Sequence, residues 1–77
     1  MASQPIQLFT TAGCPHCESA REDLEWRGLE FVEYDVEHDA AARARMLELT
    51  DGARTVPVLV EPGKPVQIGW MGRGCGV

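Results

Sequence analysis

Residues 6–17 read IQLFTTAGCPHC, a short apolar run followed by a glycine turn and two cysteines that stand two residues apart. The run Ile6–Thr10 predicts a buried strand, and Pro15 suits the first turn of a helix, where its missing N–H is not needed. Cys14 would then lie at the helix start, where free N–H groups and the helix dipole stabilise a thiolate. Because the thiolate is the species that attacks disulfides, this stretch predicts a reversible dithiol.

Length and composition predict one small domain over residues 1–77 and exclude several partners. The formal net charge is -5, from 12 acidic and 7 basic residues, which argues against nucleic acid and against an anionic membrane. The start of the chain has neither region of a signal peptide, and no apolar run reaches the ~18 residues of a membrane span. Three cysteines fit a redox protein better than a disulfide scaffold. We therefore expect a cytoplasmic protein.

Alternating periodicities predict the order β-α-β-α-β-β. The expected elements after the first strand are helices over 15–27 and 40–49 and strands over 31–36, 58–60 and 66–68. The apolar helix faces are expected to comprise Cys17, Ala20, Leu24 and Trp26 in the first helix, and Ala42, Met46 and Leu49 in the second. Asp39 is a candidate N-cap, and Gly28 and Gly52 are candidate C-terminal stops.

The connections predict an α/β fold with a four-stranded mixed sheet. The first two strands, joined by a helix, should be parallel, whereas the Pro62-Gly63 turn predicts an antiparallel hairpin for the last two. The tail, residues 69–77, has four glycines and is too glycine-rich for a stable helix. A final helix should therefore be short or absent.

The two cysteines of the motif have three readings. As a redox pair, Cys14 is the exposed nucleophile and Cys17, one helical turn deeper, is the resolving thiol. They are otherwise a buried structural pair, or part of a zinc or iron–sulfur site completed across a dimer. Zinc needs about four ligands, and no second cysteine or histidine pair follows at a metal-binding spacing. We therefore interpret Cys14 and Cys17 as a redox pair, and metal binding is the alternative hypothesis.

Four further positions carry open alternatives. His16 either stabilises the Cys14 thiolate, which would make the couple more oxidising, or is a spacer. Cys75, between two glycines, is either a third redox thiol within reach of Cys14 or an unpaired cysteine. Pro57 opens a strand in either the trans or the cis form. Trp70 either covers the core or binds a partner.

Taken together, FTTAGCPHC, TVP and the glycine after the last strand resemble the glutaredoxins of the thioredoxin superfamily, over nearly the whole chain. The ending, with RTVPVLVEPG and IGWMGRGC, more narrowly resembles the small bacterial Uxx-star group of glutaredoxin-like proteins, some with selenocysteine at the place of Cys14. The resemblance implies a minimal thioredoxin fold, a cis Pro57, and pairing of Val56 with the backbone of the substrate's cysteine. The implied substrate-binding residues are Pro15, Thr55, Val56, Pro57, Gly69 and Trp70.

The resemblance implies a disulfide oxidoreductase that cycles a Cys14–Cys17 disulfide and needs no metal or organic cofactor. Its partners would be a disulfide-containing client protein and glutathione or thioredoxin reductase as reductant, and it would be a monomer or weak dimer. Two departures predict weak glutathione binding. Near Thr10 and Thr11 the usual basic residue is missing, and residues 69–73 lack the second glycine and the acidic residue of Gly-Gly-x-x-Asp.

Overall fold

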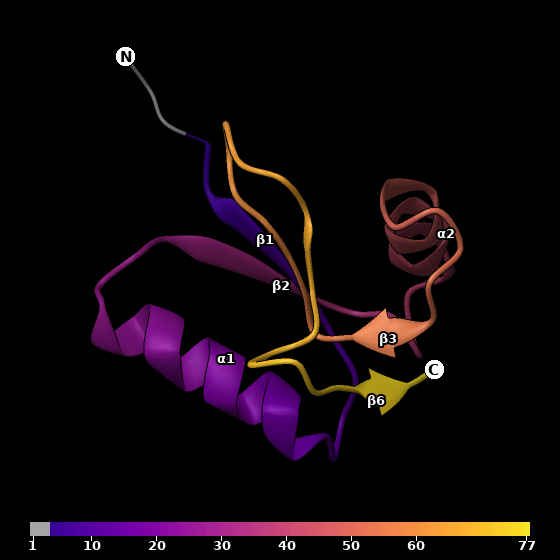
Figure 1. Ribbon diagram of the computed structural model, residues 1–77, viewed down its shortest axis with the longest axis horizontal. Helices are drawn as coiled ribbons and strands as arrows, with labels where there is room; N and C mark the ends of the chain where they lie inside the picture. Colours follow the sequence, from indigo (N-terminus) through magenta and orange to yellow (C-terminus); the bar gives the residue numbers. More distant parts are fainter. Residues whose placement is uncertain (1–3) are drawn as a thin grey trace.

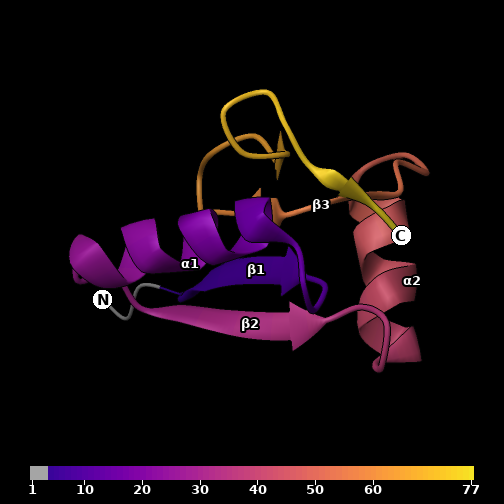
Figure 2. The same ribbon diagram turned by 90° about the horizontal axis from the view of Figure 1, so that it is seen from below.

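The computed structural model describes residues 4–77 and arranges them around a four-stranded sheet (Figures 1 and 2). The elements are β1 (Ile6–Thr10), α1 (Pro15–Trp26), β2 (Phe31–Asp35), α2 (Ala40–Leu49), β3 (Thr55–Val56), β4 (Val58–Val60), β5 (Gln67–Ile68) and β6 (Cys75–Gly76). The sheet has the order β2-β1-β4-β5, with β1 parallel to β2 and antiparallel to β4, and with β4 antiparallel to β5. The predicted α/β fold with a mixed sheet is confirmed.

Alternation along β1 separates the core into two halves. Leu8 packs in one cluster with Ala20 and Leu24 of α1, whereas its neighbour Phe9 packs in another with Met46 of α2. These five residues are fully buried, and all of them except Ala20 have large side chains. Because successive side chains of a strand point to opposite faces, the two helices cover opposite sides of the sheet. Figure 1 shows the strands lying between them.

The ends of the two predicted apolar helix faces were wrong. Trp26 is 89% exposed, because it lies two residues, about 200°, around the helix from Leu24 and points away from the sheet. Leu49, the last residue of α2, is 38% exposed, and Leu47 packs against the core cluster in its place. The predicted stops are confirmed, since Gly28 and Gly52 both have positive φ just beyond their helices.

The N-cap of α2 yields a test of local stability. Asp39 has an extended backbone, and its carboxylate accepts a hydrogen bond from the Ala42 N–H at 3.0 Å. We expect Asp39→Ala to lower the free energy of unfolding by about 1 kcal/mol, measured by denaturant titration. Asp39→Ser, which keeps an oxygen acceptor, should recover most of the loss. Equal stability of the alanine and parent proteins would contradict this role.

The glycine-rich tail is more ordered than its composition predicted. After β5 the chain turns at residues 70–73 and returns as β6, which pairs antiparallel with β3 in a separate two-stranded sheet. Neither β3 nor β6 was predicted. Among residues 4–77 no helix follows α2, which agrees with the expected loss of a final helix. The tail therefore lies beside the start of α1 (Figure 2).

Candidate functional site

Cys14 lies where β1 is connected to α1. Gly13 has a φ of 78°, a left-handed conformation that suits glycine, and it turns the chain out of the sheet. Cys14 is the N-cap residue of α1, with extended backbone angles, and Pro15 occupies the first turn. The Cys14 carbonyl accepts hydrogen bonds from the N–H groups of Cys17 and Glu18. The predicted helix-start position of this cysteine is thus found.

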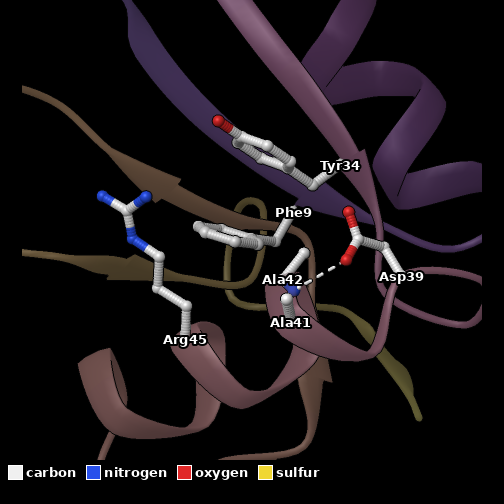
Figure 3. A pocket seen from close by; sticks show the side chains of 6 residues that line it. All are labelled: Phe9, Tyr34, Asp39, Ala41, Ala42 and Arg45. Atoms are coloured by element: carbon white, nitrogen blue, oxygen red, sulfur yellow. Dashed lines mark hydrogen bonds between the residues drawn. The ribbon is translucent and has the colours of Figure 1, made fainter.

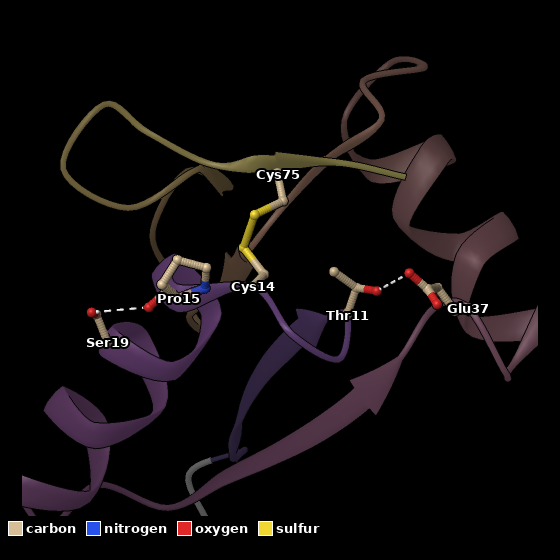
Figure 4. The surroundings of a disulfide bond; sticks show 6 residues. All are labelled: Thr11, Cys14, Pro15, Ser19, Glu37 and Cys75. Atoms are coloured by element: carbon tan, nitrogen blue, oxygen red, sulfur yellow. Dashed lines mark hydrogen bonds between the residues drawn. A yellow bond between two sulfur atoms is a disulfide. The ribbon is translucent and has the colours of Figure 1, made fainter.

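Cys14 is joined by a disulfide to Cys75, across a sequence separation of 61 residues and a Cα–Cα distance of 6.2 Å (Figure 4). The motif predicts an exposed Cys14 and a disulfide between Cys14 and Cys17, and the structure differs on both points. In the structure Cys14 is only 2% exposed, because Cys75 covers its sulfur, and Cys17 is a free thiol. Cys75 is therefore bonded to Cys14, and its role as a third redox thiol stays a prediction.

Cys17 is buried on the inner side of α1, in the same cluster as Cys14 and Val56. Burial raises the pKa of the Cys17 thiol, and the nearby Glu33 carboxylate raises it further. A hydrogen bond from the Thr11 backbone and the charge of Arg21 act in the opposite direction but do not reverse the shift. At neutral pH this sulfur therefore carries little thiolate.

The burial of Cys17 makes a direct prediction. In the oxidised protein, where it is the free thiol, we expect iodoacetamide to label Cys17 at least about a hundredfold more slowly than in the denatured chain. Labelling should accelerate as pH rises, since a thiol with a raised pKa forms its thiolate only under more alkaline conditions. Peptide mass spectrometry of timed samples measures both rates. Equal rates in native and denatured protein would contradict the burial.

The strand β3 lies directly beside the disulfide. Its register with β6 places Val56 opposite Cys75 and Thr55 opposite Gly76. The peptide bond between Val56 and Pro57 is cis, as the resemblance implied, and Pro57 is fully buried. The Pro57 carbonyl accepts a hydrogen bond from the Gly69 N–H at 2.7 Å. The structure thus brings these predicted site residues together around Cys14 and Cys75.

His16 and Trp70 line one hollow beside the start of α1. Its walls are His16, Ser19, Trp70, Met71 and Arg73. The Trp70 side chain is half-buried and packs against the core cluster beneath α1, so it covers the core. Met71 in contrast is 85% exposed at the rim. The hollow adjoins the first turn of α1 but contains neither cysteine of the disulfide.

The loop before Cys14 is bordered by carboxylates. Thr10 donates a hydrogen bond to Glu33 at 2.9 Å, and Thr11 donates one to Glu37 (Figure 4). Arg21 lines the hollow at this loop, but it lies 3.7 Å from Glu33 and is thus partly neutralised. The charged side chains beside Thr10 and Thr11 are therefore mainly negative, which disfavours an anionic thiol ligand at this loop.

A separate hollow lies between the sheet and α2 (Figure 3). Phe9 and Tyr34 stack on its floor with ring centroids 5.2 Å apart. The other lining residues are Asp39, Ala41, Ala42 and Arg45. None of these six lining residues contains sulfur, so this hollow is separate from the disulfide.

Within residues 4–77 no three His, Cys, Asp or Glu side chains lie together in a way that suits a metal ion. The sulfur atoms of Cys14 and Cys75 are bonded to each other. The alternative metal-binding reading thus gains no support from the arrangement of these side chains. In the same residues no helix is long and apolar enough to cross a membrane.

Comparison with known proteins decides the family. A model of the glutaredoxin family matches residues 6–66, from β1 to the loop before β5. The chain belongs to the glutaredoxin family. A probable glutaredoxin of Synechocystis sp. is 38% identical over 52 residues, which cover 68% of this chain and 48% of that protein. Glutaredoxin 3 of Escherichia coli is 33% identical over 52 residues, covering 68% and 61%.

A solved structure extends the likeness to three dimensions. The crystal structure of the thioredoxin-like protein BC3987 aligns with a TM-score of 0.78 and 35% sequence identity, covering 86% of this chain and 88% of that one. This supports the thioredoxin-like fold. The chain spans only 48% and 62% of the two Synechocystis glutaredoxins that it matches. The family match also ends at residue 66, so the segment that carries Cys75 lies outside it.

Proposed function

We propose that this protein reduces disulfide bonds by thiol–disulfide exchange at Cys14. One observation carries the proposal: the Cys14 sulfur, at the N-terminus of α1, is bonded to a second thiol of the same chain. A cysteine at this position accepts and gives electrons through a disulfide alone, so no metal or organic cofactor is required. Membership of the glutaredoxin family supports the same class of reaction.

In the proposed cycle the Cys14 thiolate attacks one sulfur of a client's disulfide. A bond forms between Cys14 and that sulfur, the client's S–S bond breaks, and the leaving thiolate takes up a proton. A second thiol of this chain, which the sequence analysis took to be Cys17, then loses its proton and attacks the Cys14 sulfur. The client leaves with two electrons and two protons gained, and an external thiol or dithiol reduces the protein again.

The proposed client contacts surround the edge of β3. The backbone of Val56 would pair with an extended segment of the client that contains its cysteine, because a strand edge binds peptide main chain through hydrogen bonds. The other proposed contact residues are Pro15, Thr55, Pro57, Gly69 and Trp70. Pro15 follows Cys14 in the sequence. Thr55 lies in β3, Pro57 directly follows that strand, and Gly69 and Trp70 follow β5.

His16 is proposed to tune the redox couple. As a hydrogen-bond donor or a cation it would stabilise the Cys14 thiolate and thus the reduced protein. We expect His16→Leu to make the couple more reducing, by about 30 mV for each 1.4 kcal/mol of lost stabilisation. Equilibration in thiol–disulfide buffers measures the potential, with His38→Leu as control, since His38 pairs with Asp35 instead. An unchanged potential would make His16 a spacer.

The reductant and the subgroup are parts of the same proposal. The subgroup favoured by the segments RTVPVLVEPG and WMGRGC is the Uxx-star group. A reducing compartment such as the cytoplasm suits a protein that carries electrons on thiols. We propose that it acts as a monomer or weak dimer. Glutathione and thioredoxin reductase are the candidate reductants. The carboxylates around Thr10 and Thr11 disfavour anionic glutathione.

The deciding experiment follows reduction of a protein disulfide such as insulin's in two parallel assays. One contains glutathione, glutathione reductase and NADPH, and the other contains thioredoxin reductase and NADPH. We expect turnover in at least one assay, and faster turnover with thioredoxin reductase. Absence of turnover in both, with dithiothreitol also failing to drive reduction above background, would overturn the proposed function.

A further inference from the structure

The segment after β5 holds Cys75 against Cys14 through a defined set of backbone contacts. Besides the register of Val56 with Cys75, the Val77 N–H donates to the Arg54 carbonyl at 2.8 Å. The side chains of Cys75 and Val77 both pack against the core cluster that contains Cys14. Figure 4 shows the disulfide bridging the start of α1 and this returning strand. The position of Cys75 is therefore fixed by β3 as well as by the covalent bond.

The turn that precedes Cys75 directs the strand toward β3. Trp70 and Arg73 exchange backbone hydrogen bonds of 2.6 and 2.9 Å, and the two residues between them, Met71 and Gly72, have φ values of 51° and 78°. Two successive positive φ values are what a type I′ turn requires. Such a turn reverses the chain tightly, so Cys75 is delivered by a hairpin instead of a loose tether.

Cys17 is the less accessible of the two remaining thiols. Its side chain is buried, and it stays free while Cys14 is in a disulfide. The raised pKa of Cys17 also lowers the fraction of thiolate available for attack. Burial of the Cys17 side chain thus favours the more exposed Cys75 as the thiol that reacts with Cys14.

We propose that Cys75, held on β6, is the thiol that resolves the disulfide between Cys14 and a client. This rests on the proposed function. The Cys75 thiol loses a proton and attacks the Cys14 sulfur, the Cys14–Cys75 bond forms, the Cys14–client bond breaks, and the client thiolate is protonated. Because β6 takes the backbone groups of Val56, docking of the segment also displaces a client paired with that edge. Cleavage of the Cys14–client disulfide and release of the client from β3 therefore occur together.

Gly74 is proposed as a positioning residue for this step. A Cβ atom on Gly74 would lie 2.5 Å from Thr55 Cγ2 and 2.5 Å from the Val56 carbonyl oxygen, so the strand could not approach β3 as it does. Gly76, two residues on, offers a matched control. A Cβ there would meet nothing closer than the Arg54 carbonyl oxygen at 4.0 Å.

The test mixes reduced protein with one equivalent of 5,5′-dithiobis(2-nitrobenzoate) and follows release of thionitrobenzoate. Attack by Cys14 releases the first equivalent, and resolution releases the second. We expect Cys75→Ser to slow the second phase at least about tenfold and to leave an adduct on Cys14, since the effective concentration of the tethered thiol is lost. Cys17→Ser should keep both phases and end with a Cys14–Cys75 disulfide, identified by peptide mass spectrometry.

Gly74→Ala should slow the second phase several-fold while the first phase stays unchanged, and Gly76→Ala should behave as the parent. A second phase that survives in Cys75→Ser and disappears in Cys17→Ser would overturn the proposal. Equal rates of the second phase in Gly74→Ala and Gly76→Ala would show that Gly74 does not position Cys75. A first phase that persists in Cys14→Ser at the parent's rate would instead overturn the proposed function itself.

Discussion

Replacing Cys14 with serine is expected to reduce disulfide reductase activity to background, a loss of at least about a hundredfold. A serine hydroxyl cannot form the covalent disulfide on which the exchange depends. The position adds to the loss, because the N-terminus of α1 stabilises a thiolate but does little for a neutral hydroxyl. Reduction of insulin by dithiothreitol with catalytic amounts of protein, followed by turbidity, measures the effect.

Cys75→Ser is the matched control for this experiment. Both serine variants lack the disulfide of the parent, so they share any loss of stability that follows from it. They differ in one respect, since only Cys75→Ser keeps the attacking sulfur at the helix start. It should still form a trapped disulfide with an oxidised client, whereas Cys14→Ser should not. Equal trapping by the two variants would show that attack does not occur at Cys14.

Local patterns were sufficient to predict both helices and the four strands of the main sheet. The strand at 6–10, the helix at 40–49 with its Asp39 cap, and the Pro-Gly hairpin all agree with the structure to within a residue or two. These elements follow from periodicity and from capping chemistry, which act between residues close in sequence. The one systematic error lies at helix ends, where Trp26 and Leu49 continue an apolar pattern beyond the surface that the sheet covers.

The pairing of β3 with β6 was beyond a sequence-based prediction. Each strand has two residues, too few for a pattern, and each exists because of a partner about twenty residues away. Met71 has a positive φ, which residues other than glycine rarely adopt. In the sequence, only the neighbouring Gly72 indicated a turn at this place. The candidate site was likewise predictable only in part. The helix start predicted Cys14, and the resemblance implied Pro57, but the partner of Cys14 required the tertiary fold.

Reduction of the Cys14–Cys75 disulfide is expected to lower the free energy of unfolding by about 4 kcal/mol, because the bond closes a loop of 61 residues and restricts the unfolded chain. A domain of this length is typically stable by about 4–12 kcal/mol in total, so the change is a large part of the whole. Urea titrations of the parent with and without dithiothreitol measure it. Cys17→Ser should show the same loss on reduction, and Cys75→Ser should show none.

The same free energy links folding to redox chemistry. In a thermodynamic cycle, a disulfide that stabilises the fold by about 4 kcal/mol is itself favoured by the fold by that amount, or about 90 mV, relative to the unfolded chain. The reduced protein, with β6 held on β3 only by backbone bonds and the packing of Cys75 and Val77, is then the less stable form. Two results would contradict this coupling. One is an unfolding midpoint of the parent protein that does not change when dithiothreitol is added, and the other is a Cys17→Ser variant whose midpoint no longer falls on reduction. The reductant that regenerates the protein also breaks the covalent bond between Cys14 and β6, so the Cys14 sulfur can react with a client only in the reduced protein.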